Sequence, residues 1–125
     1  MGIVLPEEFV DFMLLYGGRA VRESIFVNSN NKSYSVNNYL PPFEVNTILQ
    51  KWSMFGCVDV LPFAFEGGGS YICYSMQPDS FGKILLSRMN DEGRLWFKPI
   101  AETLDDFINE LITPKEFQTR FLGPS

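Results

Sequence analysis

Residues 61–74 read LPFAFEGGGSYICY, two apolar runs joined by three consecutive glycines. The apolar runs predict strands over 59–65 and 70–76, and the glycines predict the turn between them. A connection this short implies antiparallel neighbours, because a parallel crossover needs a dozen residues or more. A phosphate-binding loop would need a lysine after the glycines and a helix after that, and neither follows. The stretch therefore predicts a β-hairpin.

Alternation of apolar and polar residues continues toward the C-terminus and predicts further strands over 82–89 and 94–100. Turn residues separate them, Gln-Pro-Asp-Ser at 77–80 and Asn-Asp-Glu-Gly at 90–93. The second half of the chain is therefore expected to be a β-meander, followed by a helix over 104–112.

Two threonines are expected to cap helices near the C-terminus. Thr103 precedes the helix at 104–112 and is a favourable N-cap residue. Thr113 is followed by Pro114 and by Glu116, the pattern of a capping box at the start of a short helix over 114–121.

The N-terminal half has a mixed pattern. Apolar residues at helical spacing predict helices over 6–16 and 43–54, and extended segments are expected over 20–27 and 33–40. The fold class is therefore α+β: an antiparallel sheet of five to six strands with helices packed against one face.

Five segments of the chain, in this order and spacing, resemble the SUKH superfamily of Smi/Knr-like proteins. The resemblance covers roughly residues 5–112. It rests on Leu5-Pro6-Glu7-Glu8-Phe9-Val10-Asp11-Phe12 with Gly17-Gly18, Leu61-Pro62-Phe63-Ala64-Phe65-Glu66-Gly67-Gly68-Gly69, Ile72-Cys73-Tyr74, Gly82-Lys83-Ile84-Leu85-Leu86, and Ala101-Glu102-Thr103-Leu104-Asp105-Asp106-Phe107-Ile108.

The resemblance implies one SUKH-like domain over 1–125, with 113–125 as a C-terminal helical tail. Family members usually have another helix before the first motif, whereas this chain begins almost at the motif. An apolar groove is therefore expected beside the first helix. The tail with Phe117 and Phe121, or a second copy of the chain, could cover it, so both a monomer and a homodimer stay open.

The family resemblance also implies function through binding. Bacterial members are immunity proteins that neutralise a cognate toxin, often a nuclease, whereas eukaryotic members are scaffolds or regulators. We therefore expect a cytoplasmic immunity protein with a basic toxin as partner. The alternative is a non-inhibitory scaffold or regulatory adaptor that binds a cellular protein, and a third possibility is a small-ligand binder that uses the glycine turn.

Composition favours binding over catalysis. The chain has no histidine, so Ser-His-Asp and Cys-His arrangements are excluded, and we expect no catalytic, metal or cofactor site. Its net charge of −5 disfavours nucleic acid as a partner and suits a basic protein. No membrane or targeting segment is recognised. Cys57 and Cys73 lie among apolar residues, as reduced thiols do in the cytoplasm.

Four acidic residues lie in predicted turns and are the candidate partner-binding residues: Glu66, Asp79, Asp91 and Glu92. If the hairpin turns cluster at one end of the sheet, several of these carboxylates could form one negative rim. The alternative for each acid is an ordinary solvated turn residue. The sequence does not identify the apolar anchor that a tight interface would also need.

Overall fold

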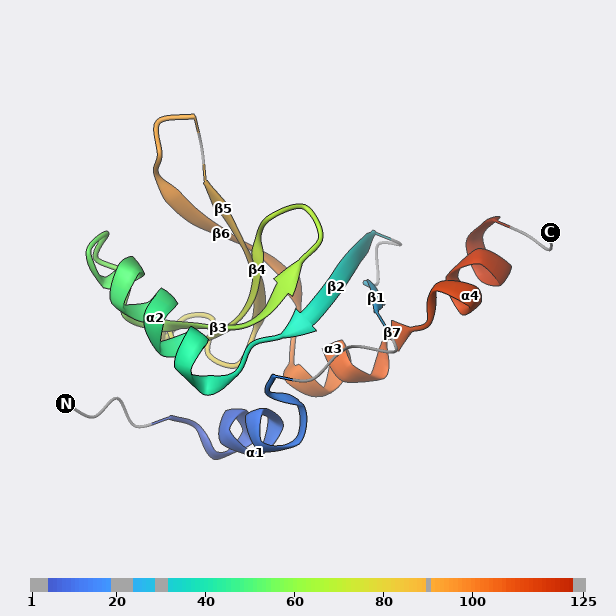
Figure 1. The fold of residues 1–125 in the computed structure, drawn as a ribbon, viewed down its shortest axis with the longest axis horizontal. Coiled ribbons are helices and arrows are strands. Elements are labelled where there is room, and N and C mark those ends of the chain that lie inside the picture. The colour runs from blue at the N-terminus through green and yellow to red at the C-terminus, as the bar shows by residue number, and fades with distance from the viewer. Residues whose placement is uncertain (1–4, 19–23, 29–31, 90, 123–125) are drawn as a thin grey trace.

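Seven antiparallel strands form one twisted sheet, with the strand order β6-β5-β4-β3-β2-β1-β7 (Figure 1). The computed structural model describes residues 5–18, 24–28, 32–89 and 91–122. The strands are β1 (Ile25–Val27), β2 (Ser33–Tyr39), β3 (Val60–Glu66), β4 (Tyr71–Ser75), β5 (Ile84–Met89), β6 (Leu95–Ala101) and β7 (Leu111–Ile112).

The meander predicted for the second half is confirmed. Strands β3 to β6 are consecutive neighbours in the sheet, and each pair is antiparallel. The extended segment expected over 33–40 is β2, which pairs with β3. Of the segment expected over 20–27, the structure describes β1, while residues 20–23 lie outside the described part of the chain.

Four α-helices accompany the sheet: α1 (Glu7–Tyr16), α2 (Pro42–Ser53), α3 (Leu104–Asn109) and α4 (Pro114–Phe117). A π-helical turn, η1 (Gln118–Leu122), continues α4. The two predicted caps are confirmed. Thr103 accepts a hydrogen bond from the Asp106 amide at 3.0 Å, and Thr113 and Glu116 form a capping box.

The main core lies between the sheet and the helices α1 and α3. Phe63 of β3 is at its centre, with ring centroids 5.0 Å from Phe12 of α1 and 5.6 Å from Phe107 of α3. Phe107 is also 4.8 Å from Phe26 of β1. These rings connect both helices to the sheet, and the edge-to-face geometry of the two Phe63 pairs adds to the stabilisation from burial.

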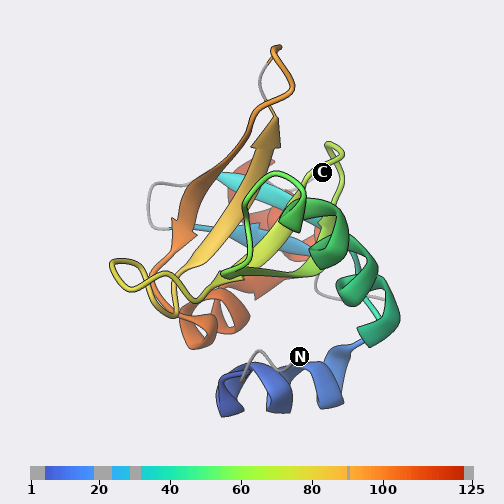
Figure 2. The same ribbon diagram turned by 90° about the vertical axis from the view of Figure 1, so that its left-hand side faces the viewer.

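A second, smaller cluster occupies the opposite face of the sheet. Trp52 of α2 packs there against Val60, Cys73 and Leu85, which alternate along their strands with residues of the main core. The expectation that the helices cover one face is therefore wrong, because α2 places its largest side chain on the second face. Figure 2 shows α1 and α2 as separate helices at two sides of the sheet.

The expected strand count and the expected end of the third helix are also wrong. Helix α3 ends at Asn109 rather than at residue 112, and Leu111–Ile112 form β7. Pairing of Leu111 with Phe26 and of Ile112 with Ile25 adds a seventh strand to the sheet. The apolar residues at 111 and 112 fit helical spacing, but strand pairing satisfies their backbone groups at the sheet edge instead.

The C-terminal helix α4 lies at the right-hand edge of the molecule in Figure 1, away from α1, which lies below the sheet. It follows β7 at the outer edge of the sheet, and Phe117 is half-buried there. One of the two expected possibilities was that the tail covers the groove beside α1. This is therefore excluded for residues 113–120. The side chain of Phe121 lies outside the described part of the chain.

One long-range hydrogen bond holds the start of α1 against the sheet. The Tyr74 hydroxyl of β4 donates to the Glu8 carboxylate at 2.7 Å. The Tyr74 side chain is buried, whereas Glu8 is exposed. Burial, and then the bond to Glu8 and its negative charge, raise the pKa of Tyr74 well above its usual value.

Replacing Tyr74 with phenylalanine is expected to lower the free energy of unfolding by about 1 kcal/mol at neutral pH, since one hydrogen bond is lost. The wild-type protein should lose further stability above about pH 10, where an unfolded tyrosine ionises but the folded one keeps its proton. This loss should be smaller in the Tyr74→Phe variant. Urea unfolding at pH 7 and from pH 9 to 11 measures both effects, and parallel pH profiles for the two proteins would contradict the assignment.

Candidate protein-binding site

The structure separates the four candidate acids between two ends of the sheet. Glu66 ends β3, and Asp91 and Glu92 lie in the turn between β5 and β6. Since turns alternate between ends in an antiparallel meander, these three acids lie at one end of the sheet and Asp79 lies at the other. Figure 1 shows the β3–β4 and β5–β6 connections on one side and the β4–β5 connection on the other. A single rim of all four acids is therefore not formed.

Glu66 has a structural contact within its own turn. Its carboxylate accepts a hydrogen bond from the Gly68 amide at 2.9 Å, and its carbonyl accepts one from the Gly69 amide at 3.0 Å. Gly69 has φ of +93°, a conformation that favours glycine. The glycine turn leads directly into β4, as expected for a hairpin connection.

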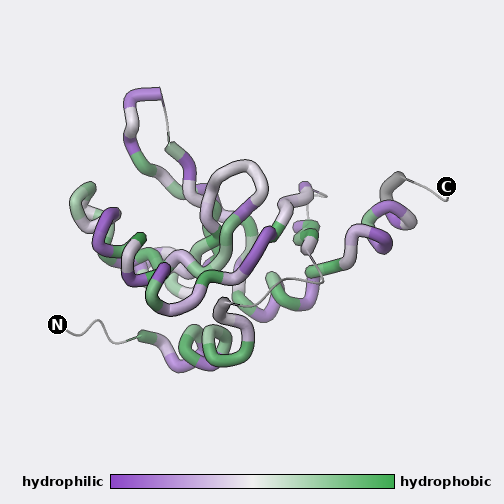
Figure 3. Tube along the Cα trace, viewed as in Figure 1, coloured by the Kyte–Doolittle hydropathy of each residue, from purple (hydrophilic) through white to green (hydrophobic). Residues whose placement is uncertain are grey.

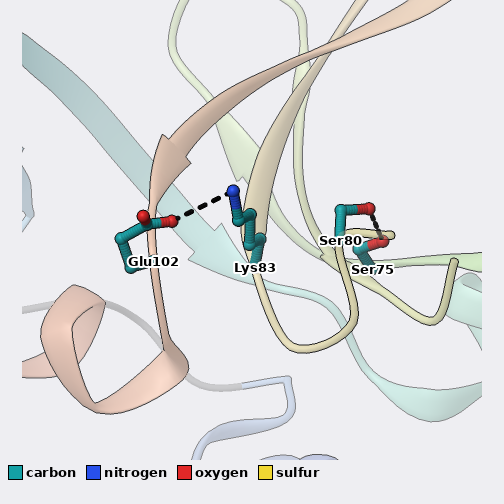
Figure 4. A network of polar contacts seen from close by, with 4 residues as sticks. All are labelled: Ser75, Ser80, Lys83 and Glu102. Atoms are coloured by element: carbon teal, nitrogen blue, oxygen red, sulfur yellow. Dashed lines mark hydrogen bonds and ion pairs between the residues drawn. The ribbon is translucent and has the colours of Figure 1, made fainter. Parts of the chain in front are cut away.

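The connection around Asp79 is held by its own polar network. The Ser75 and Ser80 hydroxyls are 2.8 Å apart, and close by Lys83 forms an ion pair with Glu102 at 3.3 Å (Figure 4). Ser75 also accepts a hydrogen bond from the Gln77 amide. These contacts explain the local structure of the turn without a ligand.

An apolar surface lies next to Asp91 and Glu92. Here a hollow of about 330 Å³ separates the loop after α2 from the β5–β6 hairpin. Phe55 lines it from the loop, and Leu95 and Phe97 line it from β6. Glu92 and Arg94 are also part of its wall, so the lining is a mixture of apolar side chains and charged groups of both signs.

Neighbouring side chains extend this apolar area onto the outside of the molecule. Phe55 is 57% exposed, and Met54, Val58 and Met89 are also exposed. In Figure 3, apolar and polar segments alternate around the β5–β6 hairpin. We call this region the hairpin surface, defined by Met54, Phe55, Val58, Met89, Glu92, Leu95 and Phe97.

Aromatic rings connect the hairpin surface with the second cluster, on the face of the sheet against which α2 packs. Phe97 packs against Trp52 at 5.5 Å, and Tyr71 packs against both Trp52 at 5.9 Å and Phe65 at 5.5 Å. The buried hydroxyl of Ser87 accepts a hydrogen bond from the Tyr71 amide. The hairpin surface is thus supported by a packed layer, which favours a preformed interface.

Glu92 is a candidate from the sequence that lies in the wall of the hollow, whereas the apolar part of the hairpin surface was not expected. Phe55 lies just after the last turn of α2, outside its apolar face. The alternation in β6 places Leu95 and Phe97 on the same face of the strand, but it does not show which other element packs on that face. The available signal was the pair Met54-Phe55 directly before Gly56, two large apolar residues at a helix terminus.

The two cysteine thiols of the second cluster have raised pKa values. Cys73 is a buried free thiol, and burial, followed by the proximity of Cys57, raises its pKa. Burial and then the negative charge of Asp59 raise the pKa of Cys57, which is half-buried. Both thiols are therefore protonated at neutral pH and unsuited to nucleophilic attack.

Within the described ranges, no group of three or more histidine, cysteine, aspartate or glutamate residues is arranged to hold a metal ion. The helices in the same part of the chain are too short or too polar to cross a bilayer. The arrangement offers a hollow with a mixed apolar and charged lining beside exposed apolar side chains, which is suited to contact with another protein.

Comparison with known families places the chain in a class of proteins. Residues 1–108 match the SUKH_6 family model, described as SMI1-KNR4 cell-wall. The match covers most of the chain, and the protein belongs to this family. The resemblance seen in the sequence is thereby confirmed, and the α+β fold agrees with it. None of the curated proteins compared with the chain matches it.

Proposed function

We propose that this protein is a cytoplasmic immunity protein, which binds a cognate bacterial toxin and blocks its action. Membership of the SUKH family supports this role and makes a binding function without catalysis the preferred one. The observation that carries the proposal furthest is the hairpin surface, where exposed apolar side chains adjoin the acids of the β5–β6 turn.

The toxin is expected to be basic, with a nuclease as the leading class. A nuclease needs clustered lysine and arginine residues to contact phosphates. The chain has a net charge of −5, which would accelerate association with such a partner. Phe55, Leu95 and Phe97 would supply the apolar anchor, while Asp91 and Glu92 would supply charge at its border.

The test begins with a pull-down of the tagged protein from its native lysate under conditions that express the genes next to its own. The captured partner is purified, its toxic activity is assayed, and the protein is titrated into the assay. We expect inhibition that is complete near one molecule of protein per molecule of toxin. Binding without inhibition would contradict the proposal and favour the scaffold or adaptor role instead.

A further inference from the structure

A second apolar hollow lies between α1 and α2, away from the hairpin surface. It has a volume of about 450 Å³, and the buried side chain of Leu61 is part of its wall. Helix α1 contributes Val10 and Leu14, and α2 contributes Val45 and Leu49. Its lining is almost entirely apolar and shares no residue with the hairpin surface.

This α1–α2 groove is open in the described part of the chain. Leu14 in its wall is 76% exposed, and Leu5, which also lines it, is 41% exposed. None of residues 113–120 lines it. Exposed apolar side chains along a groove of this kind are typical of a binding surface.

The charges beside the groove are acidic. Glu7 precedes Val10 by three residues, and Asp11 precedes Leu14 by three, so each acid neighbours a groove residue on the surface of α1. Both acids are exposed. Helix α1 has no basic residue, and the polar residue that α2 contributes to the lining is the neutral Asn46.

An apolar groove with acids along one border fits an amphipathic helix whose apolar stripe is flanked by lysine or arginine. A second copy of this chain fits less well. In a two-fold dimer both sides of the interface are the same surface, so Glu7 and Asp11 of both copies would lie at one interface with no lysine or arginine from α1 to balance them, between molecules that each have a net charge of −5.

We propose that the α1–α2 groove is a docking site for a basic amphipathic helix of a partner protein. The groove accepts apolar side chains at helical spacing, and Glu7 and Asp11 pair with cations beside them. This site is additional to the hairpin surface, and the proposal holds whether or not the protein neutralises a toxin.

The test uses two synthetic 16-residue peptides labelled with fluorescein. Both have leucines at positions i, i+3, i+7 and i+10 on an alanine-rich helix; one has lysines beside the leucine stripe, and the other has glutamates. Fluorescence anisotropy measures their binding to the full chain at low and high salt. We expect saturable binding of the lysine peptide that weakens with salt, and no binding of the glutamate peptide.

Two neighbouring leucines of α1 provide matched variants. Leu14 lines the groove, whereas Leu15 is also exposed, at 60%, but does not line it. Leu14→Lys should weaken binding of the lysine peptide by about tenfold or more, and Leu15→Lys by less than about threefold. Because both side chains are exposed, both variants should fold, which circular dichroism checks.

Four results would overturn the proposal. The first is no saturable binding of the lysine peptide, the second is equal binding of both peptides, and the third is an equal effect of both variants. The fourth is a dimer of the chain alone, detected by light scattering and lost in Leu14→Lys, which would assign the groove to a second copy. The test involves no toxin, so its failure leaves the proposed neutralising function to its own experiment.

Discussion

Replacing Phe107 with alanine is expected to lower the free energy of unfolding by about 3–5 kcal/mol and the melting temperature by about 10–20 °C. The ring is completely buried and contacts both Phe26 and Phe63, so its removal leaves a cavity between α3 and the sheet. Small domains have a total stability of about 5–15 kcal/mol, so this variant is close to unfolding. Thermal and urea unfolding measure the loss.

Phe43→Ala is the matched control, because this phenylalanine of α2 is 70% exposed. Its replacement should change the free energy of unfolding by no more than about 0.5 kcal/mol. Similar losses in the two variants, or a Phe107→Ala variant as stable as the wild type, would show that α3 is not packed on the sheet as described.

The second large effect is expected at the hairpin surface. Phe55→Lys should weaken binding of the toxin by about 30-fold or more, since it removes a central apolar contact and adds a charge that repels a basic partner. Stability should hardly change, because the side chain is 57% exposed. Calorimetric titration of the purified partner measures the affinity.

Phe81→Lys is the control for this experiment. Phe81 has the same exposure of 57% but lies in the β4–β5 connection, at the other end of the sheet. Its replacement should leave affinity within about threefold of the wild type. A larger effect at Phe81 than at Phe55 would move the interface to the end of the sheet that contains Asp79.

Local sequence signals predicted most of the elements. The turn at 66–69 and the alternation around it located β3 and β4, and Thr103 and Thr113 located the starts of two helices. These signals are short-range: a turn needs glycine at positive φ, and a helix start needs a side-chain acceptor for its free amides. Because they depend only on neighbouring residues, these signals can be recognised from the sequence alone.

Long-range features could not be predicted in the same way. The assignment of Leu111–Ile112 to β7 depends on β1, which lies more than 80 residues earlier in the chain. The position of α2 depends on the packing of Trp52 against Val60 and Cys73 on the second face of the sheet. Periodicity shows that a helix or strand has an apolar face, but it does not show which distant segment packs against that face.

The candidate site shows the same division. The turn positions of the four acids follow from local sequence, whereas their grouping in one rim was conditional on the hairpin turns lying at one end of the sheet. The alternation of turns in the meander does not meet this condition, and it places Asp79 at the end opposite Glu66, Asp91 and Glu92. The hollow beside Glu92 forms only where the loop after α2 lies next to β6, a contact between distant segments.

Rescue of growth tests the central claim most directly. The toxic partner captured in the pull-down is expressed in a bacterial host together with the wild-type protein, the Phe55→Lys variant or the Phe81→Lys variant, at matched soluble levels. Neutralisation by the hairpin surface predicts survival with the wild type and with Phe81→Lys, and loss of survival with Phe55→Lys. Death of the host in the presence of the folded wild-type protein would contradict the account.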